Sequence, residues 1–306
     1  MVPVLAFALT QLTSLTDLEE TYKASQAPHF DILKLLTVNQ GVFSLAEADE
    51  LKSPDEFIRA SSIITDVRFR FEISRVKHEL CLAALASGNP KAREEVKKTW
   101  DGYVLATGRR QPIGTIKYLD DRFKVDPAPK SIRDVFLAPY KAVERSSKMK
   151  SDEEVTKICA DDQAVRTKDW SKLSSKEMKE IMDGDKKRKT RIIDLLKKGR
   201  VVTAEDFDHA SLVLQHGSSW EDYALAHELS ICSLLLGRQE AAWLCAATYD
   251  RMSLSAGYRQ RYGTQYSSDG GGPFKLDAFD TTGIGDAERK AMHCPTLEQA
   301  KNRKWD

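Results

Sequence analysis

The second half of this chain repeats the residue spacing of the first half. His78 and His227 lie 149 positions apart, and the same offset aligns further identical residues without any gap. These pairs are Glu79 and Glu228, Gly88 and Gly237, Ala92 and Ala241, Asp101 and Asp250, Gly108 and Gly257, Gln111 and Gln260, and Gly114-Thr115 and Gly263-Thr264. We therefore expect two tandem related units, in which shared residues maintain the fold and unshared polar residues serve a special task.

The length of 306 residues fits two units that each have a core of their own. The polar run at residues 146–151 is the expected linker. The prediction is thus an apolar N-terminal segment over residues 1–15, a degenerate copy over 16–148, and a copy with a polar site over 149–306.

Helical patterns dominate both halves. Ser53 precedes Pro54 and a run of apolar residues at helical spacing, and Thr203 opens the matching run in the second half. Later in each half, a glycine separates two helical stretches and predicts a helix hairpin. The connectors that follow are short and rich in glycine, so the expected class is all-α with irregular connectors and, at most, a small β-ribbon.

The first residues leave two interpretations open. Residues 2–9 are apolar and include Ala6-Phe7-Ala8, which fits the end of a secretory signal, but no basic leader precedes them. Either the natural start lies upstream and the protein is exported to the periplasm, which we favour, or this segment is a mobile terminus or docking strand of a cytoplasmic protein. Because no stretch is apolar for about 18 residues, we expect no transmembrane segment.

Polar residues that are present in only one half mark a candidate site. Gln215-His216 stands where the first half has Thr65-Asp66, Arg251 replaces Gly102, and Gln265 replaces Ile116. In each case the second half has the larger capacity for hydrogen bonds, and each change falls beside a shared position. The second copy is therefore the expected location of the site.

The second half resembles an uncharacterised bacterial family that is classed as a domain of unknown function. Four ordered motifs over about residues 155–300 carry this resemblance: Asp162-Gln163-x-x-Arg166, Gln215-His216, Asp250-Arg251, and Gly257-x-x-Gln260-x-Tyr262-Gly263-Thr264-Gln265. The first half looks like a degenerate copy that lacks the histidine and the last glutamine. The resemblance implies that these residues belong to one functional unit, and it implies no reaction.

Two residues are candidates for catalysis. His216 could act as a general acid or base, since a neighbouring carboxylate such as Asp162 or Asp250 could tune it. His216 could equally be a capping or core histidine. Asp250, which is shared as Asp101, could instead brace the Gly-Thr segment.

Four residues are candidates for ligand binding: Gln163, Arg166, Arg251 and Gln265. Arg251 suits a carboxylate or phosphate, but a salt bridge to Asp162 or Glu228 would explain it equally well. We expect either a protein that binds or processes a small or peptide-like ligand, or a non-catalytic helical interaction module. The two differ in whether the candidate side chains converge on an open pocket.

Neither a cofactor nor a nucleic-acid partner is expected. The chain has 47 Lys and Arg against 46 Asp and Glu, and the basic run at residues 186–191 fits a solvated helix face. No glycine-rich loop follows a strand, as nucleotide binding would require. His209 and His216 could share a helix face, but two such ligands need others from elsewhere, so no metal site is predicted.

Overall fold

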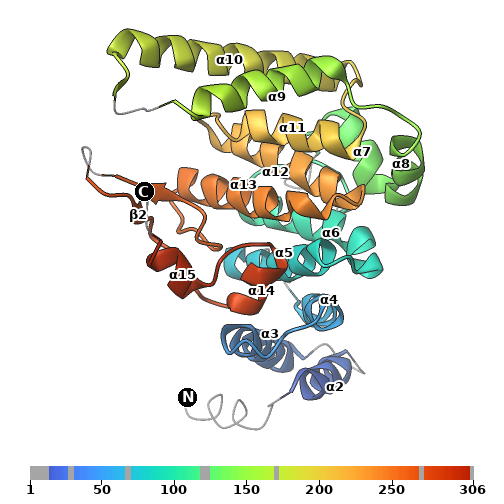
Figure 1. The fold of residues 1–306 in the computed structure, drawn as a ribbon. Coiled ribbons are helices and arrows are strands. Elements are labelled where there is room, and N and C mark those ends of the chain that lie inside the picture. The colour runs from blue at the N-terminus through green and yellow to red at the C-terminus, as the bar shows by residue number, and fades with distance from the viewer. Residues whose placement is uncertain are drawn as a thin grey trace. The chain divides into compact units, whose positions relative to one another are not determined.

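The chain forms the expected all-α fold, as a computed structural model shows (Figure 1). Helices account for nearly all regular structure, and the described strands form one two-stranded antiparallel ribbon of β1 (Tyr266–Ser267) and β2 (Lys275–Leu276). The small ribbon is therefore confirmed. The structure describes residues 14–26, 31–65, 70–117, 125–168, 172–268 and 272–303. Most of the predicted segment 1–15, and the Asp66 counterpart of His216, lie outside these ranges.

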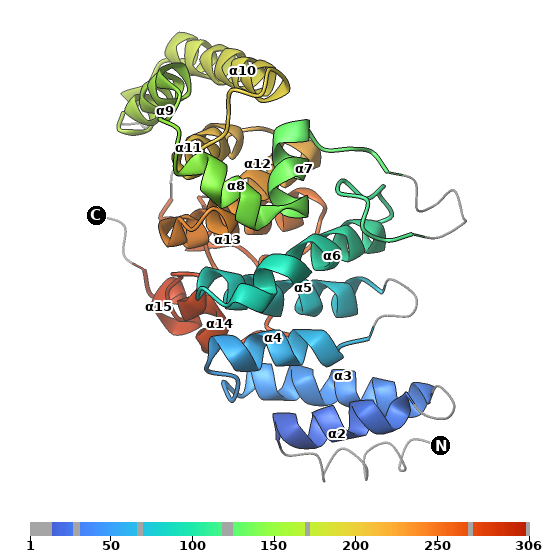
Figure 2. The same cartoon turned by 90° about the vertical axis from the view of Figure 1, so that its right-hand side faces the viewer.

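Unit 1 consists of residues 1–126 together with residues 281–292. Its helices follow one another as a stack, and both views show α5 lying against α4 and α6 (Figures 1 and 2). They are α2 (Leu15–Ser25), α3 (Ile32–Glu47), α4 (Pro54–Ile63), α5 (Phe71–Ala86), α6 (Pro90–Ala106) and α14 (Asp286–Ala291).

Unit 2 consists of residues 127–280 together with residues 293–306. Within it, α12 lies between α11 and α13, and α9 and α10 lie against α11 (Figure 1). Its helices are α7 (Lys130–Leu137), α8 (Pro139–Ser146), α9 (Glu153–Arg166), α10 (Ser175–Lys197), α11 (Ala204–Leu214), α12 (Trp220–Leu235), the short 3₁₀ helix η3 (Gln239–Ala241), α13 (Ala242–Ser255) and α15 (Leu297–Lys301).

The helices begin where the sequence places their caps. The side chain of Ser53 accepts a hydrogen bond from the backbone N–H of Glu56, and the carboxylate of Glu56 accepts one from the backbone N–H of Ser53. Thr203 and Asp206 form the same reciprocal capping box at the start of α11. Because such a box satisfies two of the free N–H groups at a helix start, it fixes where each of these helices begins.

The central helices are buried on nearly all sides. Most residues of α5 and α12 are buried, their leucine, alanine and cysteine side chains among them, and the core of each unit lies around these helices. All five cysteines are buried and free. His227 Nδ1 lies 3.0 Å from the carbonyl oxygen of Cys245, and His78 Nδ1 lies 3.0 Å from Thr99 Oγ1. These shared histidines therefore join the two helices of each hairpin.

A buried aspartate braces the connector in each unit. Asp101 accepts the backbone N–H groups of Ile113 and Thr115 at 2.9 and 2.7 Å. Asp250 accepts those of Arg261, Tyr262 and Thr264 at 2.7, 3.0 and 3.1 Å. The threonine hydroxyl donates to the same aspartate in both cases. The carboxylate thus satisfies amide groups that no helix or sheet pairs, which explains how an irregular segment can be held in place.

The compact units do not divide at the expected linker, because α7 packs on α12 of unit 2. Ile132, Val135 and Phe136 of α7 are fully buried, and this apolar face draws the chain from residue 127 onward into unit 2. Residues 146–151 accordingly lie inside unit 2. Conversely, α14 packs on α5 and belongs to unit 1. The compact units thus divide between residues 126 and 127, with residues 281–292 in unit 1, whereas the boundary of the tandem copies at residues 148 and 149 stays a prediction.

The described helices include none that combines the length and the apolar character needed to cross a membrane.

Candidate functional site

A fully buried carboxylate on α9 forms the centre of the candidate site. Asp162 has no exposed surface, and two neighbours on its own helix bind it. Gln163 Nε2 donates to Asp162 Oδ2 at 3.1 Å, and Arg166, one turn further along, donates to Oδ1 at 3.0 Å. The motif Asp-Gln-x-x-Arg therefore places all three polar groups together, because Arg166 is four residues from Asp162 and three from Gln163, and residues at these spacings lie on one helix face.

His216 approaches this carboxylate from the end of α11. The helix ends at Leu214, and the backbone N–H groups of His216 and Gly217 close a turn onto Val213 and Leu214. This turn places His216 Nδ1 at 2.9 Å from Asp162 Oδ2, with 18% of the histidine side chain exposed. The Nδ1 atom is buried and has no hydrogen bond of good geometry among the described residues, so the two groups meet at ion-pair distance.

Asp162 is ionised at neutral pH because its cationic neighbours outweigh its burial. Burial alone would raise its pKa, but the close contact with His216 and the charges of His216 and Arg166 lower the pKa below its ordinary value. A buried charge of this kind is stable only when it is paired and hydrogen-bonded, as it is here.

Helix α10 supplies two further members that the sequence patterns do not reveal. Arg188 Nε lies 3.2 Å from Asp162 Oδ1, and Arg188 also pairs with Asp185. Arg166 contacts the same Asp185 at 2.5 Å. Two arginines thus lie between two aspartates. The spacing of Asp185 and Arg188 resembles many exposed helix pairs, so only the packing of α10 on α9 distinguishes this one.

The basic run on α10 is only partly a solvated face. Arg188 is 16% exposed, and Lys189 Nζ lies 2.7 Å from Asp222 Oδ2 at the start of α12. Lys186 and Lys187 are exposed as expected. The inward members of the run therefore tie α10 to the site.

His216 lies at the edge of an open pocket of about 460 Å³. The pocket lies between the middle of α10 and the turn after α11, and six of its eight lining residues have polar or charged side chains. The lining residues are Met182, Asp183, Asp185, Lys186, Lys189, His216, Gly217 and Ser218. A small polar group could therefore reach the imidazole from solvent.

Arg251 on α13 lies behind the turn after α11. Its guanidinium hydrogen-bonds to Tyr223, and the Tyr223 hydroxyl donates to the carbonyl oxygen of Gly217 at 2.8 Å. Arg251 forms no salt bridge to Asp162 or Glu228, which were its two expected partners. It is close enough to Arg166 for the two positive charges to repel each other.

Asp250 and Gln265 belong to a different cluster. All described hydrogen bonds of the Asp250 carboxylate go to the connector, and burial raises the pKa of this group. Gln265 is buried, and its Nε2 donates to Thr264 Oγ1 at 2.8 Å and to the carbonyl oxygen of Ala247 at 3.4 Å. Neither residue has a described contact with His216. The structure therefore brings Gln163, Arg166 and His216 together, with Arg251 nearby, and places Asp250 and Gln265 in the brace of the Gly-Thr segment.

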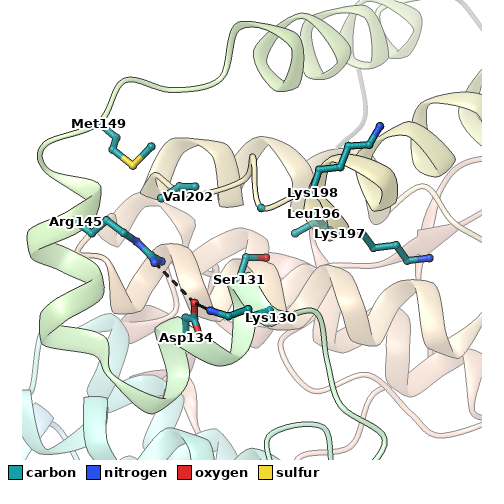
Figure 3. Close-up of a pocket in the computed structure, with 10 residues that line it drawn as sticks. Lys130, Ser131, Asp134, Arg145, Met149, Leu196, Lys197, Lys198 and Val202 are labelled. Atoms are coloured by element: carbon teal, nitrogen blue, oxygen red, sulfur yellow. Dashed lines mark hydrogen bonds and ion pairs between the residues drawn. The ribbon is translucent and has the colours of Figure 1, made fainter.

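A second pocket of unit 2 contains none of the predicted residues. Asp134 of α7 pairs there with Lys130 at 2.6 Å and with Arg145 of α8 at 3.8 Å (Figure 3). Lys197 and Lys198 lie on the opposite wall, at the end of α10. The pocket is basic, but its cations are largely exposed and its single acid is already paired.

Among the described residues, no group of three or more histidine, cysteine, aspartate or glutamate side chains is arranged to hold a metal ion. His209, whose Nδ1 is buried, does not join His216. Comparison of the chain with protein-family models, curated proteins and solved structures finds no match.

Proposed function

We propose that unit 2 carries a general acid–base site that acts on a small or peptide-like ligand. The observation that carries this proposal is the contact between His216 Nδ1 and Asp162 Oδ2 at the edge of an open pocket. A buried carboxylate that orients an imidazole leaves Nε2 to take or give a proton. A histidine with a purely structural role in the core would be fully buried, as His227 is, whereas His216 lines a pocket.

Each neighbour of the dyad has a positioning task in this proposal. Asp162 holds a negative charge next to the imidazole ring, while Gln163, Arg166 and Arg188 hold the carboxylate in one orientation. Such support matters because a misplaced acid–base group loses much of its effect. Asp250 is not retained as a catalytic residue, since the connector occupies its carboxylate, and Gln265 is not retained as a ligand-binding one.

The resemblance to the uncharacterised bacterial family supports the location of the site. Residues of two of its four motifs, Asp162 and His216, are in contact with each other and His216 lines the pocket, while the fourth motif contains the Gly-Thr connector braced by Asp250. We further propose that the two units descend from one ancestral unit, which the matching capping boxes and aspartate braces support.

The test is a panel of chromogenic carboxylic esters, phosphate esters and aminoacyl anilides offered to the full chain. His216→Gln should lower the turnover of any accepted substrate about 10²- to 10⁴-fold, the usual contribution of acid–base catalysis. His209→Gln on α11 is the matched control and should stay within about twofold, because this residue does not touch Asp162.

Equal turnover by the wild type and His216→Gln would refute the proposal. If the wild type converts no member of the panel, the interaction module becomes the better reading. In that case, ligand binding without turnover would still be expected at the pocket beside His216.

A further inference from the structure

The second pocket of unit 2, which we call the Ser131 pocket, contains a buried hydroxyl group. This pocket has a volume of about 450 Å³ and is bounded by the start of α7, by α8 and by the end of α10 (Figure 3). Ser131 is 7% exposed, and its Oγ has no hydrogen-bond partner among the described residues. Because a buried hydroxyl without a partner costs free energy, this group indicates a polar occupant of the pocket.

The hydroxyl lies at the first turn of a helix. Ser131 is the second residue of α7, and its side chain points from α7 towards the end of α10 (Figure 3). Pro129 is the N-cap of α7, and no described side chain caps the first N–H groups. Such groups carry a partial positive charge and commonly bind anions. Lys130 and Ser131 both line the pocket, so the first turn of α7 borders it.

The lining also carries more positive than negative charge. Among the described lining residues Asp134 is the single acid, and Lys130 and Arg145 share it at 2.6 and 3.8 Å. Lys198 pairs with an aspartate of its own helix at 2.9 Å. Lys197 lines the pocket as well and forms no described ion pair. An anion would therefore find charge that the described part of the chain does not neutralise.

The set of donors favours a phosphoryl group over a carboxylate. Arginine suits the two oxygens of a planar carboxylate, but Arg145 already lies beside Asp134. The other cations of the lining are lysines, which bind phosphate as point charges. A tetrahedral phosphoryl group can also accept from a hydroxyl, from a helix start and from ammonium groups on two sides at once. Met149 and Val202 add apolar surface that suits the carbon part of a small phosphate ester.

We infer that the Ser131 pocket binds the phosphoryl group of a small phosphate monoester. Ser131 Oγ donates to one phosphoryl oxygen, the first turn of α7 faces the same group, and Lys130 and Lys197 offset its charge. The ligand thereby supplies the partner that the hydroxyl lacks within the described chain. The pocket shares no described lining residue with the pocket beside His216, so this inference does not rest on the acid–base proposal.

The experiment measures the binding of phenylphosphonate to the full chain by isothermal titration calorimetry at pH 8 and low salt. Its phosphorus–carbon bond does not hydrolyse, so binding is observed without turnover. The wild type should bind it, and Ser131→Ala should bind at least about tenfold more weakly, as the loss of a hydrogen bond to a charged group would. Ser147→Ala is the matched control, because this serine is exposed at the end of α8 and does not line the pocket.

Two comparisons sharpen this measurement. Without ligand, Ser131→Ala should unfold at the same temperature as the wild type, since the change removes no described hydrogen bond. Benzoate, which joins the same ring to a carboxylate, should bind the wild type at least about tenfold more weakly than phenylphosphonate. Equal affinity for the two anions would overturn the assignment of a phosphoryl group.

Lysine acetylation tests the site in the wild-type chain, so the inference stays testable if Ser131→Ala fails to fold. Phenylphosphonate should slow the acetylation of Lys197 several-fold, as followed by mass spectrometry. Lys187 is exposed on the same helix outside the pocket, and its acetylation should not change. Equal slowing at both lysines would place the anion elsewhere and overturn the inference.

The remaining outcomes separate this site from the proposed function. The site is refuted if the wild type does not bind phenylphosphonate, or if Ser131→Ala binds it as tightly as the wild type. A loss of binding in His216→Gln that Ser131→Ala does not share would place the anion beside His216 and would also overturn the inference. Turnover in the ester panel bears on none of these results, so the two proposals can fail independently.

Discussion

His216 Nδ1 lies 2.9 Å from Oδ2 of Asp162, although the two residues come from separate helical segments of unit 2. The contact joins the turn after α11 to the middle of α9, and Asp162 is fully buried beneath it. Geometry of this kind makes the carboxylate important for stability, so its removal gives the first prediction.

Asp162→Asn should lower the free energy of unfolding at pH 7 by about 2–4 kcal/mol, because it leaves Arg166 and Arg188 without a buried counter-charge. The pKa of Asp162 is lowered in the folded state, so its stabilisation is present above the unfolded value near ~3.9 and is lost as the pH falls through the folded value. Urea unfolding at pH 7 and pH 3 should thus show a large difference at pH 7 that shrinks at pH 3. Asp161→Asn, at an exposed neighbour, should change little at either pH.

Glu288 should make the protein less stable as the pH rises. Burial, with the charges of Asp49 and Glu79, raises its pKa to about 7. Because this folded value lies above the unfolded one, the folded state retains a proton that the unfolded state has lost between about pH 4.5 and 7. The stabilisation from protonated Glu288 is complete below pH 4.5 and is lost by about pH 7. This loss lowers the free energy of unfolding by roughly 3 kcal/mol.

Glu288→Gln should therefore raise the urea midpoint at pH 8 relative to the wild type and have little effect at pH 5. Glu298→Gln, an exposed site on α15, is the control and should be neutral at both pH values. An unchanged midpoint at pH 8 would show that Glu288 ionises in the fold without cost.

His227 should make the protein less stable as the pH falls below 6.5. Complete burial lowers its pKa to about 3, although the carbonyl of Cys245 partly opposes this. The unfolded state then binds a proton that the folded state does not bind. The free energy of unfolding therefore falls by up to about 1.4 kcal/mol for each unit by which the pH is lowered from 6.5 to 3. Urea unfolding or hydrogen exchange of His227→Gln should show a stability that changes less with pH over this range, although the variant is less stable than the wild type at pH 7. A pH dependence as steep as that of the wild type would contradict the assignment.

Gly257→Ala should destabilise the fold by about 1 kcal/mol. Gly257 ends α13 with φ of +81°, and no atom lies within 4 Å of an added Cβ, so the penalty is conformational and not steric. Gly102→Ala inside α6 is the contrasting control, with its nearest atom at 4.0 Å. This change should stabilise the protein by about 0.5–1 kcal/mol, since alanine favours a helix interior. Thermal unfolding that shifts in the same direction for both variants would contradict this assignment.

The sequence by itself determined the features that depend on near neighbours. Ser53 and Thr203 predict helix starts, because a capping box needs only residues three apart. Gly88 and Gly257 predict helix ends, since their positive φ values arise in the last turn. Asp162, Gln163 and Arg166 could be grouped in advance because they share one helix face. The repeated spacing also offered a bracing role for Asp101 and Asp250, although Asp250 stood among the candidates for catalysis.

Only the tertiary structure decided which distant groups meet. Arg188 could not be distinguished from its exposed neighbours on α10 until that helix packed on α9, because burial depends on the partner surface and not on local pattern. Likewise, α7 joins unit 2 through an apolar face that fits α12, which moves the boundary away from the polar run at residues 146–151. The contact between His216 and Asp162 emerges from the same packing, since long-range contacts are set by shape and buried area that a linear sequence does not display.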